Sequence, residues 1–266
     1  MSTSHDSTLP PGVYMTRLQS GNLVPSKPLM NLLVAAREDY RDWPKRGMKP
    51  AESQQAIIDL ETEVAHLLGA LNESSAHMIV TKVSNWGRNR KKALVEGASP
   101  QDRTHMLAAI RLIMDPAKLR SGLDELSELP GLALVMATKV YRFCCANKGG
   151  AVDKHASNFF NSLDILDSNG VPCKSTHFKL GWKGRLETYS LDRKDHLTNL
   201  NQFFEVYLPL LTQLADFLNE RRVTYRCAAT KMPKSWCPAD VEMATYYWGA
   251  QKARSGKISA TTQTSC

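Results

Sequence analysis

Apolar residues recur at intervals of three and four along most of the chain, which is the period of an amphipathic helix. The clearest stretch is residues 57–71, where the apolar residues share one helical face. We expect helices at residues 30–44, 57–71, 73–86, 99–113, 119–126, 132–145, 197–218 and 237–249. A strand-like or irregular pattern is confined to residues 170–188. The pattern predicts an all-α fold, and we find no internal repeat.

Two of these helices have recognisable start signals. Ser99 is followed by Pro100 and then by Asp102, so a capping hydroxyl, a first-turn proline and a carboxylate that reaches back occur together. Asp115 and Pro116 repeat the signal before the helix that carries Leu119.

The two ends of the chain lack such periodicity. Residues 1–26 are rich in Ser, Thr, Pro and Gly, and residues 254–266 are polar. We therefore expect a flexible or surface-draped N-terminal arm and a loose C-terminal tail.

Composition places the chain among soluble globular proteins. Of 266 residues, 42% are hydrophobic and 23% are charged, which excludes a fibrous or wholly disordered chain. No apolar run reaches the roughly 18 residues that a membrane helix needs. The polar N-terminus predicts a cytoplasmic protein that is not secreted.

Charge narrows the class of partner. Lys and Arg outnumber Asp and Glu by 34 to 26, a net charge of +8. A basic balance favours an anionic partner, with nucleic acid ahead of a membrane surface. The six cysteines form no C-x-x-C pair, so we expect reduced thiols. Cys173 and His177 make only a pair, which gives little support for zinc, and we expect no metal site.

The chemically informative segment begins with a tight turn at residues 129–133. Pro130 sets a turn and Gly131 can adopt a positive φ, while the next helix opens with free N–H groups. Free N–H groups at a helix start bind an anion such as a phosphate. An ordinary helix–helix turn is the alternative interpretation.

The helix after this turn leads into Gly149-Gly150-Ala151-Val152-Asp153-Lys154-His155. An L-P-G turn, an apolar helix and a loop ending in V-D-x-H resemble the helix-hairpin-helix superfamily of DNA glycosylases. The resemblance covers residues 115–160. It implies two helical lobes with a DNA and base cleft between them: a central domain at residues 50–160, and a second lobe from residues 27–49 and 161–253.

The resemblance implies base removal without strand cleavage. Family members that also cleave the strand carry a nucleophilic lysine at the position of Val135, which is 18 residues before Asp153. Lys139 follows one turn later. It is either a displaced nucleophile or an ordinary solvated or phosphate-facing lysine. Ala133 stands where the family has a second hairpin glycine, so the backbone would lie slightly further from a phosphate.

Asp153 is the candidate catalytic residue. Cleavage of an N-glycosidic bond builds positive charge on the deoxyribose, which a carboxylate stabilises while it orients or deprotonates water. The alternative interpretation is a helix N-cap, and the family uses this Asp in both ways. His155 matches the motif but suits a structural or phosphate-contacting role better than that of a base.

The resemblance also implies double-stranded DNA as partner and a nucleoid-associated monomer. No cofactor is expected apart from an allowed monovalent cation at the hairpin, and Cys227 and Cys237 are too few for an iron–sulfur cluster. The candidate DNA-binding residues are Leu129, Gly131, Ala133, Val135, Lys139, Lys148, Lys154, His155, Arg88 and Arg90. The candidate base-pocket or wedge residues are Trp86, Trp182, Trp236 and Tyr247.

The target could be a damaged base, as in base excision repair, or a modified base of phage DNA, as in antiviral defence. Two other readings stay open. One is a noncatalytic DNA-binding protein that has the same hairpin. The other is a small helical protein with a chance L-P-G turn.

Overall fold

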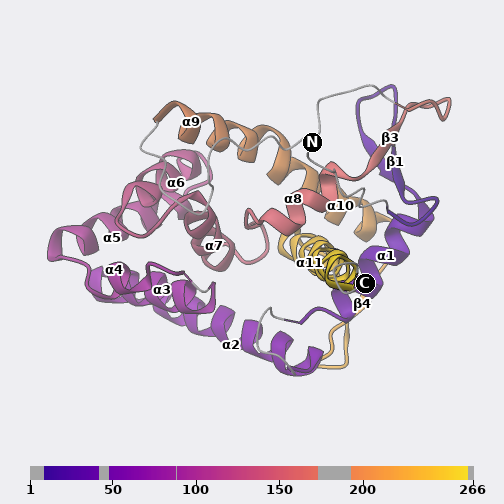
Figure 1. Ribbon diagram of the computed structural model, residues 1–266. Helices are drawn as coiled ribbons and strands as arrows, with labels where there is room; N and C mark the ends of the chain where they lie inside the picture. Colours follow the sequence, from indigo (N-terminus) through magenta and orange to yellow (C-terminus); the bar gives the residue numbers. More distant parts are fainter. Residues whose placement is uncertain (1–8, 42–47, 88, 173–192, 263–266) are drawn as a thin grey trace.

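The computed structural model describes residues 9–41, 48–87, 89–172 and 193–262, and it is mostly helical (Figure 1). This confirms the all-α class at that level. The helices are α1 (Lys27–Glu38), α2 (Pro50–Gly69), α3 (Glu73–Trp86), α4 (Lys92–Glu96), α5 (Pro100–Met114), α6 (Leu119–Glu128), α7 (Leu134–Cys144), α8 (Lys154–Asn161), α9 (Arg193–Gln202), α10 (Leu208–Glu220) and α11 (Pro238–Thr262). The specific glycosylase fold and its two lobes stay predictions.

The start signal at Ser99 is confirmed. Ser99 Oγ accepts a hydrogen bond from Asp102 N at 3.1 Å, and an Asp102 carboxylate oxygen accepts one from Ser99 N at 3.1 Å. The start expected at Asp115 is wrong, because α6 begins at Leu119 behind Lys118. Asp115 instead accepts a hydrogen bond from Ala117 N, which makes a local turn before the helix.

The helix expected over residues 197–218 is interrupted. A π-helical segment, η2 (Phe203–Tyr207), separates α9 from α10. Pro209 supplies the reason, because it has no N–H to donate and its ring crowds the carbonyl four residues earlier. The wider π turn accommodates both effects.

The expected N-terminal arm is corrected for residues 14–25. They form β1 (Tyr14–Arg17) and β2 (Leu23–Pro25), which pair antiparallel, and β1 also pairs in parallel with β3 (Asp164–Leu166). Met15 and Leu23 are buried.

A second small sheet joins β4 (Tyr225–Arg226) to β5 (Pro233–Lys234). Such short strands give too few alternations to be seen as a pattern. Most of the irregular stretch expected at residues 170–188 lies outside the described residues.

The expected loose tail is also corrected, because α11 continues to Thr262 rather than ending near Gly249. The chain beyond Gly249 has no apolar stripe to mark a helix, yet Gln, Lys, Ala and Arg at positions 251–254 all have high helix propensity.

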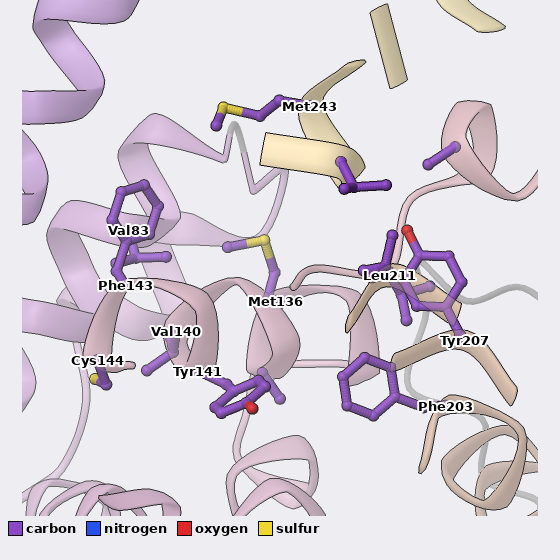
Figure 2. Packing of buried hydrophobic residues seen from close by; sticks show 14 of the residues in the cluster. Val83, Met136, Val140, Tyr141, Phe143, Cys144, Phe203, Tyr207, Leu211 and Met243 are labelled. Atoms are coloured by element: carbon purple, nitrogen blue, oxygen red, sulfur yellow. The ribbon is translucent and has the colours of Figure 1, made fainter. Parts of the chain in front are cut away.

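Most residues of α7 are buried in one continuous hydrophobic cluster. Figure 2 shows its side chains Met136, Val140 and Phe143 among residues of α3, η2, α10 and α11. The helix that follows the L-P-G turn is therefore held by the core, and any group attached to it has a defined position. None of the described helices is long and apolar enough to cross a membrane.

Candidate active site

The turn between α6 and α7 has the geometry that the sequence predicts. Gly131 has a φ of +82°, and Leu132 N donates to Leu129 O at 3.0 Å. An added Cβ on Gly131 would lie 3.0 Å from Lys91 O. Asn89 Nδ2 donates to Gly131 O at 2.8 Å. Glycine is required here both for its φ and for the close approach of the 89–91 loop.

This loop brings basic residues to the turn. Arg90, Lys91 and Lys92 are exposed beside it, whereas Arg88 lies outside the described residues. Helix α7 begins behind Ala133, which provides no side-chain cap. Free N–H groups and exposed cations therefore lie close together, an arrangement suited to a phosphate. Leu129 and Ala133 are buried, so only their backbone could contact DNA.

Asp153 is the N-cap of α8. Its Oδ1 accepts a hydrogen bond from His155 N at 2.6 Å, and the side chain is half-buried. Its Oδ2 accepts no hydrogen bond from any described residue. The capping interpretation is thus confirmed, and one carboxylate oxygen remains for chemistry.

The loop before Asp153 is hydrogen-bonded to residues of the core. Val152 N donates to Thr138 Oγ1 of α7 at 3.0 Å, and Tyr207 Oη donates to Ala151 O at 2.9 Å. An added Cβ on Gly149 would lie 2.7 Å from Arg142 Cα, so the loop backbone lies directly on α7. The same helix therefore sets the positions of the hairpin and of Asp153.

Three further charged groups surround this region. Arg142 is fully buried, with Nη2 3.3 Å from Glu61 Oε1 and Nε 4.0 Å from Glu242 Oε2. Lys139 Nζ donates to Gly87 O at 3.4 Å. Burial raises the pKa of Glu242 to about 7; the Asp153 charge adds to this, while Arg142 and Lys139 oppose it. Glu242 therefore interacts electrostatically with Asp153, Lys139 and Arg142.

Sequence reasoning missed Glu242. A signal was present, because this carboxyl lies between Val241 and Met243 in an apolar stretch, where an isolated charge is rarely buried without a partner.

The remaining motif residues differ in how exposed their side chains are. Lys148 and Lys154 are exposed and available to a phosphate backbone, and Val135 is half-buried. The His155 ring packs edge-on against Tyr246 at 5.6 Å, and an added Cβ on Gly249 would clash with the His155 carbonyl. This packing favours the structural role for His155.

The three candidate aromatic residues that the structure describes each contact a different aromatic residue. Trp86 packs edge-on against Phe143 and lies 5.8 Å from Lys139 Nζ. Trp236 is 4% exposed and packs against Tyr225, so it suits a wall rather than a wedge. Tyr247 lies beside Tyr40. Trp182 is outside the described residues.

Within the described ranges, no group of three His, Cys, Asp or Glu side chains could hold a metal ion. The cysteines described there, Cys144, Cys145, Cys227 and Cys237, are all free thiols. No known protein family, curated protein or solved structure matches the chain.

Proposed function

We propose that the chain is a monofunctional DNA glycosylase of the helix-hairpin-helix class. It would hydrolyse the N-glycosidic bond of a modified or damaged base in double-stranded DNA and leave an abasic site. The observation that carries the proposal is the position of Asp153. Asp153 is a half-buried carboxylate, and one of its two oxygens accepts no hydrogen bond from a described residue. Its loop is hydrogen-bonded to α7, the helix that begins at the proposed phosphate-binding turn.

The chemistry follows from that carboxylate. As the C1′–N bond breaks, positive charge develops on the deoxyribose, and Asp153 stabilises it electrostatically. A water molecule adds its oxygen to C1′ and loses a proton, and the base leaves with the bonding electron pair and takes up a proton. Asp153 orients or deprotonates that water.

Two observations support hydrolysis without strand cleavage. Val135 occupies the position that a nucleophilic lysine would need, and Lys139 Nζ donates to Gly87 O next to the Trp86 ring. The exposed cations beside Gly131 would hold the DNA backbone without reading bases. The protein would act as a monomer in the cytoplasm, in repair of damaged bases or in defence against phage DNA with modified bases.

Base release tests the proposal. Duplexes carrying alkylated, oxidised, deaminated, hydroxymethylated or glucosylated bases are incubated with the protein, abasic sites are cleaved with alkali, and released bases are identified by mass spectrometry. Asp153→Asn keeps an N-capping side chain. It should lower the cleavage rate by about 10²-fold or more, the scale of losing one transition-state electrostatic contact.

Asp167→Asn is the matched control, because Asp167 also accepts backbone hydrogen bonds in a turn, from Asn169 and Val171, outside the motif. It should leave the rate unchanged. If Asp153→Asn is as active as the wild type, Asp153 does not have the proposed role. If the protein binds duplex DNA but releases no base from any substrate, the noncatalytic DNA-binding alternative holds.

A further inference from the structure

Helix α11 runs alongside the segment that carries Asp153. An added Cβ on Gly150 would lie 3.9 Å from the carbonyl oxygen of Pro238, the first residue of α11. Further along the same helix, the ring of Tyr246 packs edge-on against the ring of His155, with 5.6 Å between their centroids. Asp153 therefore lies between two points at which its own segment meets α11.

Glu242 lies on the face of α11 that is turned toward this segment. It precedes Tyr246 by four residues and Gly249 by seven, so the three residues share one side of the helix. An added Cβ on Gly249 would clash with the His155 carbonyl, which places that side directly against α8. Glu242 consequently faces the start of α8, where Asp153 is the N-cap.

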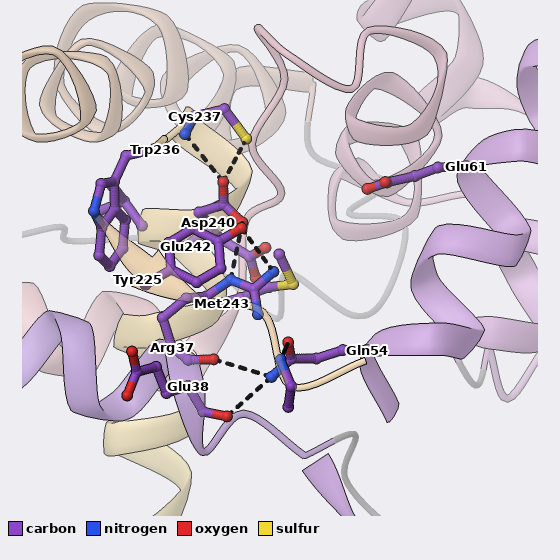
Figure 3. Close-up of polar contacts among 12 residues, drawn as sticks. Arg37, Glu38, Gln54, Glu61, Tyr225, Trp236, Cys237, Asp240, Glu242 and Met243 are labelled. Carbon is purple, nitrogen blue, oxygen red and sulfur yellow. Dashed lines mark hydrogen bonds and ion pairs between the residues drawn. The ribbon is translucent and has the colours of Figure 1, made fainter. Parts of the chain in front are cut away.

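The Glu242 carboxyl group lacks the partners that buried carboxylates usually have. Its side chain is 8% exposed, and neither oxygen accepts a hydrogen bond from a described residue. Arg142 Nε is 4.0 Å from Oε2, which is too far for a hydrogen bond. In Figure 3, Asp240 on the same helix accepts hydrogen bonds from Arg37 and Cys237, whereas no dashed line reaches Glu242. Buried polar groups are nearly always hydrogen-bonded, so an exception indicates a functional use.

Both carboxyl groups have an accessible oxygen. Arg142 Nε and Nη1 are unpaired and fully enclosed, but neither oxygen of Glu242 is fully enclosed. Asp153 is half-buried, and its Oδ2 accepts no hydrogen bond from a described residue. A proton can therefore reach and leave both groups.

The charges around Glu242 set its proton affinity. The charged and titratable groups that interact with it are Arg142 and Lys139 of α7, Arg37 of α1, Asp153 before α8 and Tyr207 of η2. Burial raises the pKa of Glu242 to about 7; the Asp153 charge adds to this, while the three cations oppose it. Burial also raises the pKa of Tyr207 far above its usual range, so this hydroxyl stays neutral. Glu242 consequently gains and loses a proton near neutral pH.

Building on the proposed glycosylase function, we infer that Glu242 is the proton-accepting partner of Asp153. As the water oxygen bonds to C1′, the proton that the water loses passes by way of Asp153 to the Glu242 carboxylate. Glu242 becomes a neutral acid and later releases the proton to solvent, and the departing base takes its own proton from solvent. Asp153 thereby keeps the negative charge that stabilises the deoxyribose. A base whose proton affinity matches the working pH is the most effective acceptor.

The pH dependence of base release tests this role. Single-turnover rates are measured on a duplex that the wild type cleaves. The rate should rise about tenfold per pH unit up to about pH 7 and then level off, because only the ionised form of Glu242 accepts a proton.

Variants of Glu242 assign this rise to one residue. Glu242→Gln has the same size but accepts no proton, so it should lower the plateau at least tenfold and abolish the rise. Glu242→Asp keeps a carboxyl group and should restore the rise. Glu61→Gln is the matched control, because Glu61 is the other carboxylate beside Arg142, at 3.3 Å from Nη2. It should keep the rise, and a merely structural role of Glu242 would leave the rise in Glu242→Gln as well.

NMR detects the interaction of the two carboxyl groups without DNA. The carboxyl carbon of Glu242 is titrated in the wild type and in Asp153→Asn. The variant should shift the midpoint to lower pH, because the Asp153 charge raises the pKa of Glu242. Asp167→Asn, which lies outside the motif, should leave the midpoint unchanged.

The outcomes separate this inference from the proposed function. If the wild type releases no base from any duplex, the glycosylase function fails, and the role of Glu242 in it fails as well. If the wild type releases a base but Glu242→Gln keeps the rise, only the inference about Glu242 is overturned. An unchanged midpoint of Glu242 in Asp153→Asn also overturns it, because the two groups would then not interact.

Discussion

Glu242 is a single carboxyl group on a helix face packed against the Asp153 loop, and its position has a thermodynamic consequence. Burial raises its pKa to about 7, with the Asp153 charge adding and Arg142 and Lys139 opposing. In the unfolded chain its pKa returns to about 4.5. Between these two values the folded protein binds more protons than the unfolded chain, so this group makes stability fall as pH rises.

Replacing Glu242 with Gln should therefore flatten the pH profile of stability. The contribution of Glu242 is fully present below about pH 4.5 and is lost as pH rises through about 7. The wild type should lose on the order of 1–3 kcal/mol relative to Glu242→Gln across this window. Urea unfolding at several pH values measures it. Glu125→Gln, at an exposed site on α6, should keep the wild-type slope; an unchanged slope in Glu242→Gln would contradict the prediction.

In the proposed glycosylase, Lys139 is the residue that would decide between hydrolysis and strand cleavage. Its Nζ donates to the Gly87 carbonyl, and Val135 stands where the proposed family would have a nucleophilic lysine. We expect that sodium borohydride traps no covalent complex between the protein and a substrate duplex. A bifunctional glycosylase on its own substrate is the positive control. A trapped complex that disappears in Lys139→Met would show that Lys139 is a displaced nucleophile.

At the scale of elements, the sequence was informative where a helix is long and one-sided. The pattern of residues 73–86 matches α3 to the residue, because Asn72 and Ser75 cap its start. The strands β1 and β2 were missed because four and three residues give no measurable period. The break at η2 is caused by Pro209. The apolar pattern continues through this proline, so the pattern alone does not reveal the break.

The hairpin between α6 and α7 makes a prediction at this scale. Gly131→Ala should destabilise the protein by about 1–3 kcal/mol and weaken binding to duplex DNA, because the residue has a positive φ and would press on Lys91 O at 3.0 Å. Thermal unfolding and fluorescence anisotropy measure the two effects.

Gly170→Ala is the matched control for this variant. Gly170 has a φ of +80°, but an added Cβ would meet no atom of the described residues within 4 Å. It should cost stability through its φ alone and leave DNA affinity unchanged. Equal DNA affinity of Gly131→Ala and the wild type would show that the turn does not contact DNA.

At the scale of the whole molecule, the candidate site and the buried network around Arg37 and Asp240 differ in how visible they are in the sequence. The hairpin and Asp153 lie close together along the chain and are joined by one helix, so a linear motif reveals them. That network gathers Arg37, Gln54, Tyr225 and Asp240 from distant segments, and all four line one cavity. Nothing in their local patterns marks them, because only tertiary packing brings Arg37 and Asp240 to 2.9 Å.

The net charge of +8 also acts at this scale, and its effect depends on where the cations lie. Arg90 and Lys92 are exposed beside Gly131, where DNA phosphates are expected. Each phosphate contact contributes about −0.9 to the slope of log K against log salt concentration on duplex DNA. The double variant Arg90→Gln/Lys92→Gln should therefore make the slope shallower by about 1.8 between roughly 50 and 200 mM salt. Arg111→Gln/Lys118→Gln removes the same charge from exposed positions at the end of α5 and just before α6, and it should keep the wild-type slope. If both double variants change the slope equally, binding follows net charge and not the hairpin surface.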